Sequence, residues 1–164
     1  MILRCTAKLL ELIAGSGVAL ADAPPSDDDW YANVFSLERR KCLLFMHAGT
    51  LFPVFVADVR KPDLRPLGPY VVSVIEAALT EEQLPRDGLG TLDPASVHIA
   101  RTTSRSLLGF LTEIVHECRW LVEAAGGLDH MPTDALNHRL RRVLHNRDGY
   151  QDALDLVAAR LKVP

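Results

Sequence analysis

The chain has 164 residues, of which 48% are hydrophobic and 24% are charged, and its formal net charge is −3. A chain of this length can bury about two-thirds of its unfolded surface, so we expect one domain over residues 1–164. The mildly acidic balance gives no global support for binding to nucleic acid or to an anionic membrane. No apolar run approaches the roughly 18 residues that a transmembrane helix needs, so we expect no membrane partner.

The amino terminus predicts a strand over residues 2–5, followed by a helix that Thr6 caps and Gly15 ends. The apolar stripe of this helix consists of Leu9, Leu10, Leu12 and Ile13. Residues 1–23 also imitate a secretory signal, because basic residues, an apolar stretch and small residues follow one another. Glu11 interrupts the apolar stretch, so we expect the first strand to be retained.

Residues 16–29 predict a surface loop that carries the acidic triplet Asp27, Asp28 and Asp29. The triplet does not form a calcium-binding loop, because the glycine at the sixth position and the distal glutamate are missing. We therefore expect solvated carboxylates.

The central stretch predicts three strands joined by two tight turns. Its apolar runs, residues 31–37, 42–46 and 51–57, have strand length, and connections this short join antiparallel neighbours. The second and third runs are apolar on both faces, which indicates cover on both sides. Pro53 cannot donate to a strand ladder, so the third strand is expected at or near an edge. Gly49 can supply the positive φ that a tight turn demands.

The second half of the chain predicts mainly helices. One begins near Gly68, residues 80–95 form an irregular connection, and residues 97–100 form a further strand. The longest helix spans residues 104–125, where apolar side chains recur at three- and four-residue spacing.

Two shorter helices are expected after it, beginning at Thr133 and at Gly149. The inward residues of the first are Leu136, Leu140, Val143 and Leu144. The order of elements, β-α-β-β-β-α-β-α-α-α, indicates an α+β domain. We expect a mixed, mostly antiparallel sheet of about five strands built on the three-stranded meander, with about five helices packed on it.

Several short stretches stand out in combination along most of the chain. They are ILRCTAKL at 2–9, WYAN at 30–33, RRKC at 39–42, TLF at 50–52, SRSLLGF at 104–110 and LNHRL at 136–140. Together they resemble a family of small bacterial proteins that is known only as a domain of unknown function. The resemblance implies a cytoplasmic bacterial protein that keeps its first strand, and it brings no established activity.

The motifs of common enzymatic and cofactor chemistry are absent from the sequence. It contains no phosphate-binding glycine loop, dinucleotide-binding fingerprint, nucleophile elbow or HExxH pair. His116 and Glu117 begin like the last of these, but position 120 is a tryptophan. We therefore expect no cofactor and no metal, and we assign no catalytic residue.

The remaining histidines and the cysteines give weak signals. His138 and His145 share a helix face only if that helix extends far enough, and a metal would require closer ligands. We favour solvent-facing or capping histidines. Cys5, Cys42 and Cys118 are odd in number and lie in apolar runs, which predicts buried thiols in a reducing cytoplasm. A catalytic pair of Cys118 with a histidine stays open, because such partners meet only in the fold.

One functional signal remains, a clustering of basic residues around the meander. The candidate binding residues are Arg39, Arg40, Lys41, Arg60 and Lys61, with Arg65 close behind and a later group at Arg139, Arg141, Arg142 and Arg147. In an antiparallel meander the first turn and the end of the third strand lie at the same end of the sheet. The two groups can therefore merge into one positive patch. The plainer alternative is a solvated turn that discourages aggregation between sheet edges.

The sequence favours a non-enzymatic binding domain that acts through a protein partner. The alternative is nucleic-acid binding through the basic end of the meander, since arginine-rich patches bind phosphate backbones as well as acidic protein surfaces. Few aromatic residues accompany the patch, which weakens the case for single strands. An enzyme of unrecognised type is the third alternative.

Overall fold

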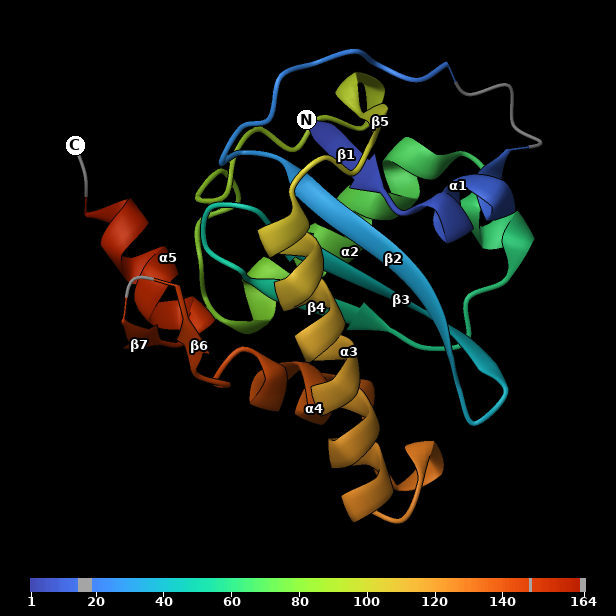
Figure 1. Cartoon of the computed structure of the whole chain (residues 1–164), viewed down its shortest axis with the longest axis vertical. Helices are drawn as coiled ribbons and strands as arrows, with labels where there is room; N and C mark the ends of the chain where they lie inside the picture. The colour runs from blue at the N-terminus through green and yellow to red at the C-terminus, as the bar shows by residue number, and fades with distance from the viewer. Residues whose placement is uncertain (15–18, 148, 163–164) are drawn as a thin grey trace.

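A five-stranded sheet forms the centre of the computed structural model, which describes residues 1–14, 19–147 and 149–162 (Figure 1). The strands are β1 (Ile2–Cys5), β2 (Trp30–Leu37), β3 (Arg40–His47), β4 (Pro53–Val56) and β5 (His98–Arg101). Their order is β4-β3-β2-β1-β5. β1 is parallel to both of its neighbours, whereas β2, β3 and β4 form the predicted antiparallel meander.

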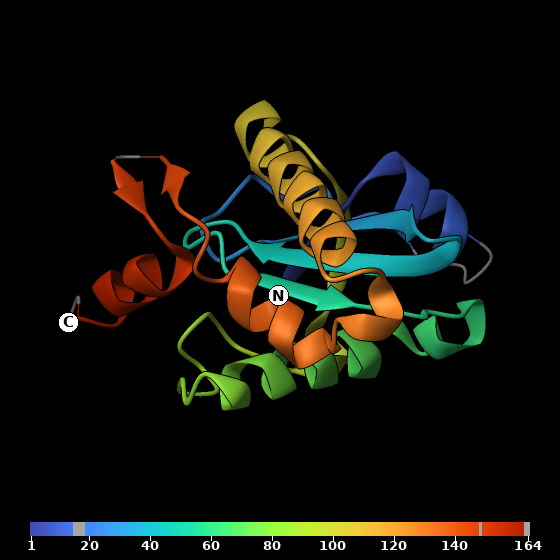
Figure 2. The same cartoon turned by 90° about the horizontal axis from the view of Figure 1, so that it is seen from below.

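Helices cover both faces of this sheet. The α-helices are α1 (Ala7–Ile13), α2 (Leu67–Glu81), α3 (Arg105–Ala124), α4 (Thr133–Leu140) and α5 (Ala153–Leu161). Short 3-10 helices are η1 (Lys61–Leu64), η2 (Pro94–Ser96) and η3 (Leu128–His130). Figure 2 shows α2 and α3 on opposite sides of the sheet. The predicted α+β class is confirmed, with a mixed sheet and helices packed on it. Among the described helices, none combines the length and apolar character needed to span a membrane.

Each face of the sheet has its own hydrophobic core. Trp30 and Leu43 pack with residues of α1, α2 and α5, whereas Tyr31 and Leu44 pack with residues of α3 and α4. This division follows from strand geometry, because successive side chains point to opposite faces. Residues 42–47 are all buried, so the prediction of cover on both sides is confirmed for β3.

The outer edge of β4 is closed by a side chain of α4. Phe55 donates its backbone N–H to Asn137 Oδ1 at 2.7 Å, and Asn137 Nδ2 donates to the carbonyl oxygen of Phe55 at 2.9 Å. The amide therefore replaces a neighbouring strand at this position. β4 begins at Pro53 and lies at the edge, as the sequence predicts.

The edge of β5 is covered in part by the chain that follows α1. Leu20 forms an isolated parallel bridge with Ile99, and Ala21 donates its N–H to the carbonyl oxygen of Ile99 at 2.7 Å. The glycine predicted to end α1, Gly15, lies outside the described residues. Both edges of the main sheet thus have local cover.

The acidic triplet forms ion pairs with arginines from three separate parts of the chain. The pairs are Asp27 with Arg147, Asp28 with Arg160 of α5, and Asp29 with Arg4 of β1. Asp29 is buried, and its Oδ2 lies 2.5 Å from the Nε of Arg4. The expectation of solvated carboxylates is therefore wrong for Asp29, because an isolated sequence window does not reveal a buried arginine from another strand.

The chain between α4 and α5 differs from the prediction. A small hairpin forms there from β6 (His145–Asn146) and β7 (Tyr150–Gln151), and it projects away from the sheet in Figure 2. Gly149 has a φ of 109° and belongs to this hairpin, so the prediction that it begins a helix is wrong. Leu144 is 61% exposed, because α4 ends before it, and its predicted inward position is also wrong.

The turn between β3 and β4 needs a glycine for a different reason from the predicted one. Leu51 has the positive φ, 56°, whereas Gly49 does not appear among the residues with positive φ. A Cβ atom at Gly49 would lie 2.8 Å from the carbonyl oxygen of Asp27. The close approach of the loop that carries Asp27 therefore explains why a residue without a side chain is needed at position 49.

Candidate functional site

The structure brings the two predicted basic segments together at one end of the sheet. Val59 donates its N–H to the carbonyl oxygen of Lys41 at 2.9 Å, and Arg40 makes two hydrogen bonds to Asp58. The turn after β2 therefore lies beside the segment that follows β4, as the alternation of strand direction requires.

Carboxylates neutralise part of this basic end. Arg40 also binds Asp129 at 2.6 Å, and Arg60 binds Asp63 at 3.1 Å. The hydrogen bonds to Asp58 raise the pKa of Arg40, and those from Arg60 lower the pKa of Asp63. The exposed cations of this end that form no ion pair with a described residue are Arg39, Lys41, Lys61 and Arg65.

The basic end is also divided between the two faces of the sheet. Arg40 and Lys41 are neighbours in β3, so their side chains point to opposite faces. Arg40 reaches Asp129 of η3 beside α3, whereas Lys41 has the orientation of Leu43, which belongs to the core under α1 and α2. Arg40 and Lys41, two of the five candidate residues, therefore extend toward opposite faces of the sheet.

Two members of the later arginine group, Arg141 and Arg142, bind carboxylates at the end of α2. Arg141 is 1% exposed, lies over the ring of Phe52 with 4.8 Å to the ring centroid, and donates to Glu81 and Glu82 at 3.1 Å each. Arg142 binds Glu82 at 3.0 Å. These contacts attach α4 to the end of α2, so Arg141 and Arg142 do not contribute to a free surface patch.

The cysteines are buried and free, as predicted. Burial raises the pKa of Cys5 to about 12 and also raises the pKa of Cys118, so both thiols stay protonated near neutral pH. His145 is 4% exposed, which contradicts a solvent-facing position, and burial lowers its pKa. Within the described ranges, no group of three or more histidine, cysteine, aspartate or glutamate side chains is placed to hold a metal ion.

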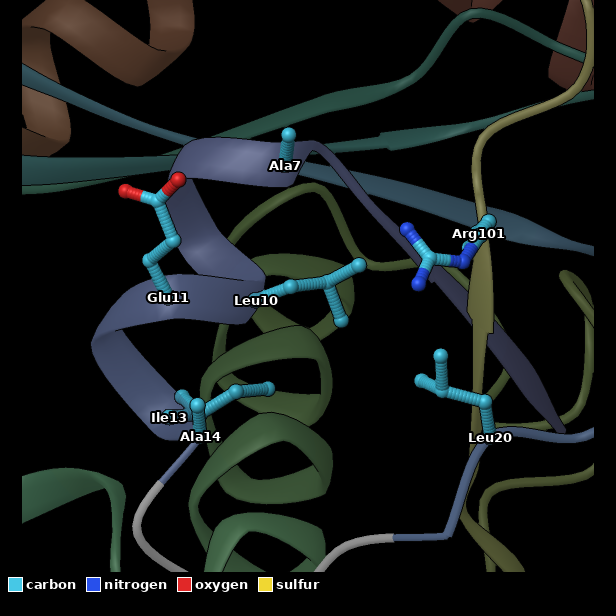
Figure 3. A pocket seen from close by; sticks show the side chains of 7 residues that line it. All are labelled: Ala7, Leu10, Glu11, Ile13, Ala14, Leu20 and Arg101. Carbon is cyan, nitrogen blue, oxygen red and sulfur yellow. The ribbon is translucent and has the colours of Figure 1, made fainter.

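An apolar hollow of about 350 Å³ lies between α1 and the β5 edge (Figure 3). Its apolar lining consists of Ala7, Leu10, Ile13, Ala14 and Leu20. Four of these residues come from α1 and its carboxyl end, where spacings of three and four place side chains on one helix face. Leu10 is half-buried and Leu20 is 43% exposed. Figure 3 shows Leu10 and Leu20 extending into the hollow from opposite sides.

One cation enters this hollow. The guanidinium of Arg101 points into it from the end of β5, whereas Glu11 points away on the outer side of α1 (Figure 3). Arg101 is exposed, and its side chain forms no ion pair or hydrogen bond with any residue in the described part of the chain. A second hollow of about 310 Å³, lined in part by Asp22 and Thr103, shares Leu20 and Arg101 with the first.

Strand pairing explains how these residues meet. Cys5 lies opposite Arg101 in the parallel register of β1 and β5, and α1 begins at Ala7 immediately afterwards. The bridge from Leu20 to Ile99 then brings the returning chain to the same edge. Sequence reasoning missed this hollow, because no local pattern specifies that β5 pairs with β1.

A comparison with family models agrees with the sequence motifs. The family model described as "Domain of unknown function (DUF6933)" matches residues 2–155, which include the sheet, the hollow and the basic end. No curated protein matches the chain. Because the match spans nearly the whole sequence, the predicted resemblance is confirmed. The chain therefore belongs to the DUF6933 family, a domain of unknown function.

Proposed function

We propose that this chain is a non-enzymatic binding domain that engages a protein partner at the hollow between α1 and β5. The supporting observation is the guanidinium of Arg101, which points into an apolar hollow and has no partner among the described residues. Protein interfaces are enriched in arginine and in apolar anchors that leave water together. Exposed leucine surface around a cation gives a partner both a hydrophobic and an electrostatic contribution.

The environments of two buried cysteines support the non-enzymatic part of the proposal. The raised pKa values of Cys5 and Cys118 disfavour the thiolate that a cysteine nucleophile needs. We place the domain in a reducing bacterial cytoplasm. Three free, buried cysteines support the reducing compartment, and the family resemblance supports the bacterial origin.

Nucleic-acid binding at the basic end is the second candidate. Arg39, Lys41 and Lys61 support it, because they are exposed there and form no ion pair with a described residue. The pairing of Arg40 and Arg60 with carboxylates, and the division of the cluster between two faces, favour the hollow instead.

Quantitative co-purification tests this proposal. Tagged wild type, Arg101→Glu and the control Arg105→Glu are expressed in cells of the source organism, and extracts with and without nuclease treatment are compared by mass spectrometry. Arg105 is a suitable control because it is exposed, lies at the first residue of α3, and tolerates an acidic replacement at a helix amino terminus. We expect at least one protein to be retained by wild type and Arg105→Glu and lost from Arg101→Glu. Equal recovery from all three proteins, or recovery that nuclease abolishes, contradicts the proposal.

A further inference from the structure

We infer that the partner segment carries an acidic side chain beside aliphatic side chains, so that its carboxylate binds Arg101 while an aliphatic group fills the hollow. The inference rests on the proposed function and specifies the chemistry that the same site recognises.

The shape of the hollow determines the aliphatic part. A volume of about 350 Å³ is at the small end of the range for ligand sites, which suits short side chains better than a large cofactor. Leu10, Ile13 and Leu20 supply aliphatic surface without an aromatic platform. Stacking of a base or an aromatic ring therefore finds no counterpart among the lining residues.

The guanidinium determines the acidic part. A guanidinium offers five N–H donors in a planar fork that matches a carboxylate through two parallel hydrogen bonds. Arg101 extends beside Leu10 and Leu20, so a partner that covers these leucines also removes water from the ion pair. Removal of water strengthens such a pair, because the local dielectric constant falls.

The surrounding charges favour a single carboxylate over a polyanion. Glu11 lies at the rim of the hollow with its carboxylate directed outward, and Asp22 lines the adjoining hollow, but neither forms an ion pair with Arg101. Their negative charges reduce the positive potential around the guanidinium and disfavour a phosphate backbone with many charges. One carboxylate can still be bound by direct hydrogen bonds to Arg101.

The edges of the sheet favour recognition through side chains. A partner strand that extended the sheet would need free backbone groups along β4 or β5. The side-chain amide of Asn137 forms hydrogen bonds with the backbone N–H and carbonyl groups of Phe55 in β4. In β5, the carbonyl oxygen of Ile99 accepts a hydrogen bond from the N–H of Ala21. A short segment that inserts side chains between α1 and Leu20 fits this arrangement better than an added strand.

Peptide titrations followed by ¹⁵N–¹H correlation spectra test the inference. The probes are acetylated, amidated peptides of sequence GSLDLSG, GSLNLSG and GSADASG. We expect GSLDLSG to shift the amide signals of Leu10, Leu20 and Arg101 with a dissociation constant on the order of 1 mM. The other two peptides should bind at least about tenfold more weakly, because each lacks one of the two interactions.

Two protein variants assign the effect to Arg101. Arg101→Gln should bind GSLDLSG and GSLNLSG equally, whereas the control Arg105→Gln should keep the wild-type preference. Unchanged spectra outside the hollow show that each variant is folded. Equal binding of the acidic and amide peptides to wild type, or no shift at the hollow at about 10 mM peptide, overturns the inference.

The two proposals fail in different ways. If the peptides show no acidic preference but a protein still co-purifies in an Arg101-dependent manner, the inferred chemistry is wrong and the proposed function stands. If neither the peptides nor any protein depends on Arg101, both proposals are wrong.

Discussion

His47 is a buried histidine at the carboxyl end of β3, and its environment holds it neutral. Its Nδ1 accepts a hydrogen bond from the N–H of Thr50 at 3.2 Å and lies 3.0 Å from the Thr50 hydroxyl. Its ring packs edge-on against Trp30, with 5.2 Å between centroids. Burial lowers the pKa of His47 to about 3, and the nearby Arg160 adds to the effect.

This pKa predicts a specific loss of stability in acid. Between about pH 6.5 and 3 the unfolded chain protonates His47 and the folded chain does not. The unfolded state therefore binds more protons, and the free energy of unfolding falls as pH decreases through this window. A shift of this size corresponds to on the order of 5 kcal/mol, and the contribution is constant above pH 6.5.

Urea unfolding at a series of pH values measures this contribution. His47→Asn keeps an acceptor for Thr50 and loses the titrating ring, so its stability should depend less steeply on pH between 6.5 and 3 than that of wild type. His116→Gln provides the control for a histidine on the exposed face of α3. Equal slopes for wild type and His47→Asn would show that His47 is not the group responsible.

Asn137 tests how the β4 edge is closed. Asn137→Ala leaves the N–H and carbonyl groups of Phe55 buried without partners, and should lower the free energy of unfolding by about 2–4 kcal/mol. Asn137→Asp should cost more, because it replaces a donor with a buried negative charge. The exposed Asn146 offers a matched control, for which replacement by alanine should cost less than about 0.5 kcal/mol. Similar losses at the two asparagines would contradict this role.

At the scale of elements, periodic patterns predict the long helices and strands well. They do not predict short or irregular segments. The apolar stripe of α3 predicts its length and its buried face, because many residues repeat the same spacing. The β6–β7 hairpin has strands of two residues, which is too short for any periodicity to show. Leu144 illustrates the consequence, since an apolar residue just beyond α4 reads as another inward position although it is exposed.

The buried face of α3 gives a direct stability prediction. Leu111 is 1% exposed, so Leu111→Ala should leave a cavity and reduce the free energy of unfolding by about 2–5 kcal/mol. Glu113 lies on the exposed face of the same helix. Glu113→Ala serves as the control, and its free energy of unfolding should change by less than about 0.5 kcal/mol. Chemical denaturation of both variants measures the difference. A loss below about 0.5 kcal/mol for Leu111→Ala would mean that another face of α3 is buried.

At the scale of the whole molecule, the sequence predicts which segments lie at the same end of the sheet. It predicts less well which side chains form ion pairs and which strands pair. Strand alternation correctly places the segments around Lys41 and Lys61 at one end of the sheet. It does not reveal that Arg40 meets Asp129, because that contact depends on where α3 ends. The hollow around Arg101 depends in the same way on the pairing of β1 with β5, so long-range packing determines both candidate sites.

Salt dependence tests the charge distribution at the basic end. We expect nucleic-acid binding there to be weak and to depend on Lys41 and Lys61, since Arg40 is already paired with two carboxylates. The double variant Lys41→Ala/Lys61→Ala should make the log–log salt slope shallower by up to about two units on duplex DNA, and Arg40→Ala should change it little. Binding to mixed-sequence DNA and RNA is measured between about 50 and 200 mM salt. A reduction in slope that Arg40→Ala produces on its own would contradict this charge distribution.

Site-specific photo-crosslinking in cells of the source organism tests the location of the binding site most directly. A photoreactive amino acid replaces Glu11 at the rim of the hollow or Lys61 at the basic end, both of which are exposed. We predict a discrete protein adduct from position 11, lost when Arg101→Glu is added, and no comparable adduct from position 61. Adducts that arise only at position 61, or that contain nucleic acid, would contradict a protein-binding hollow between α1 and β5.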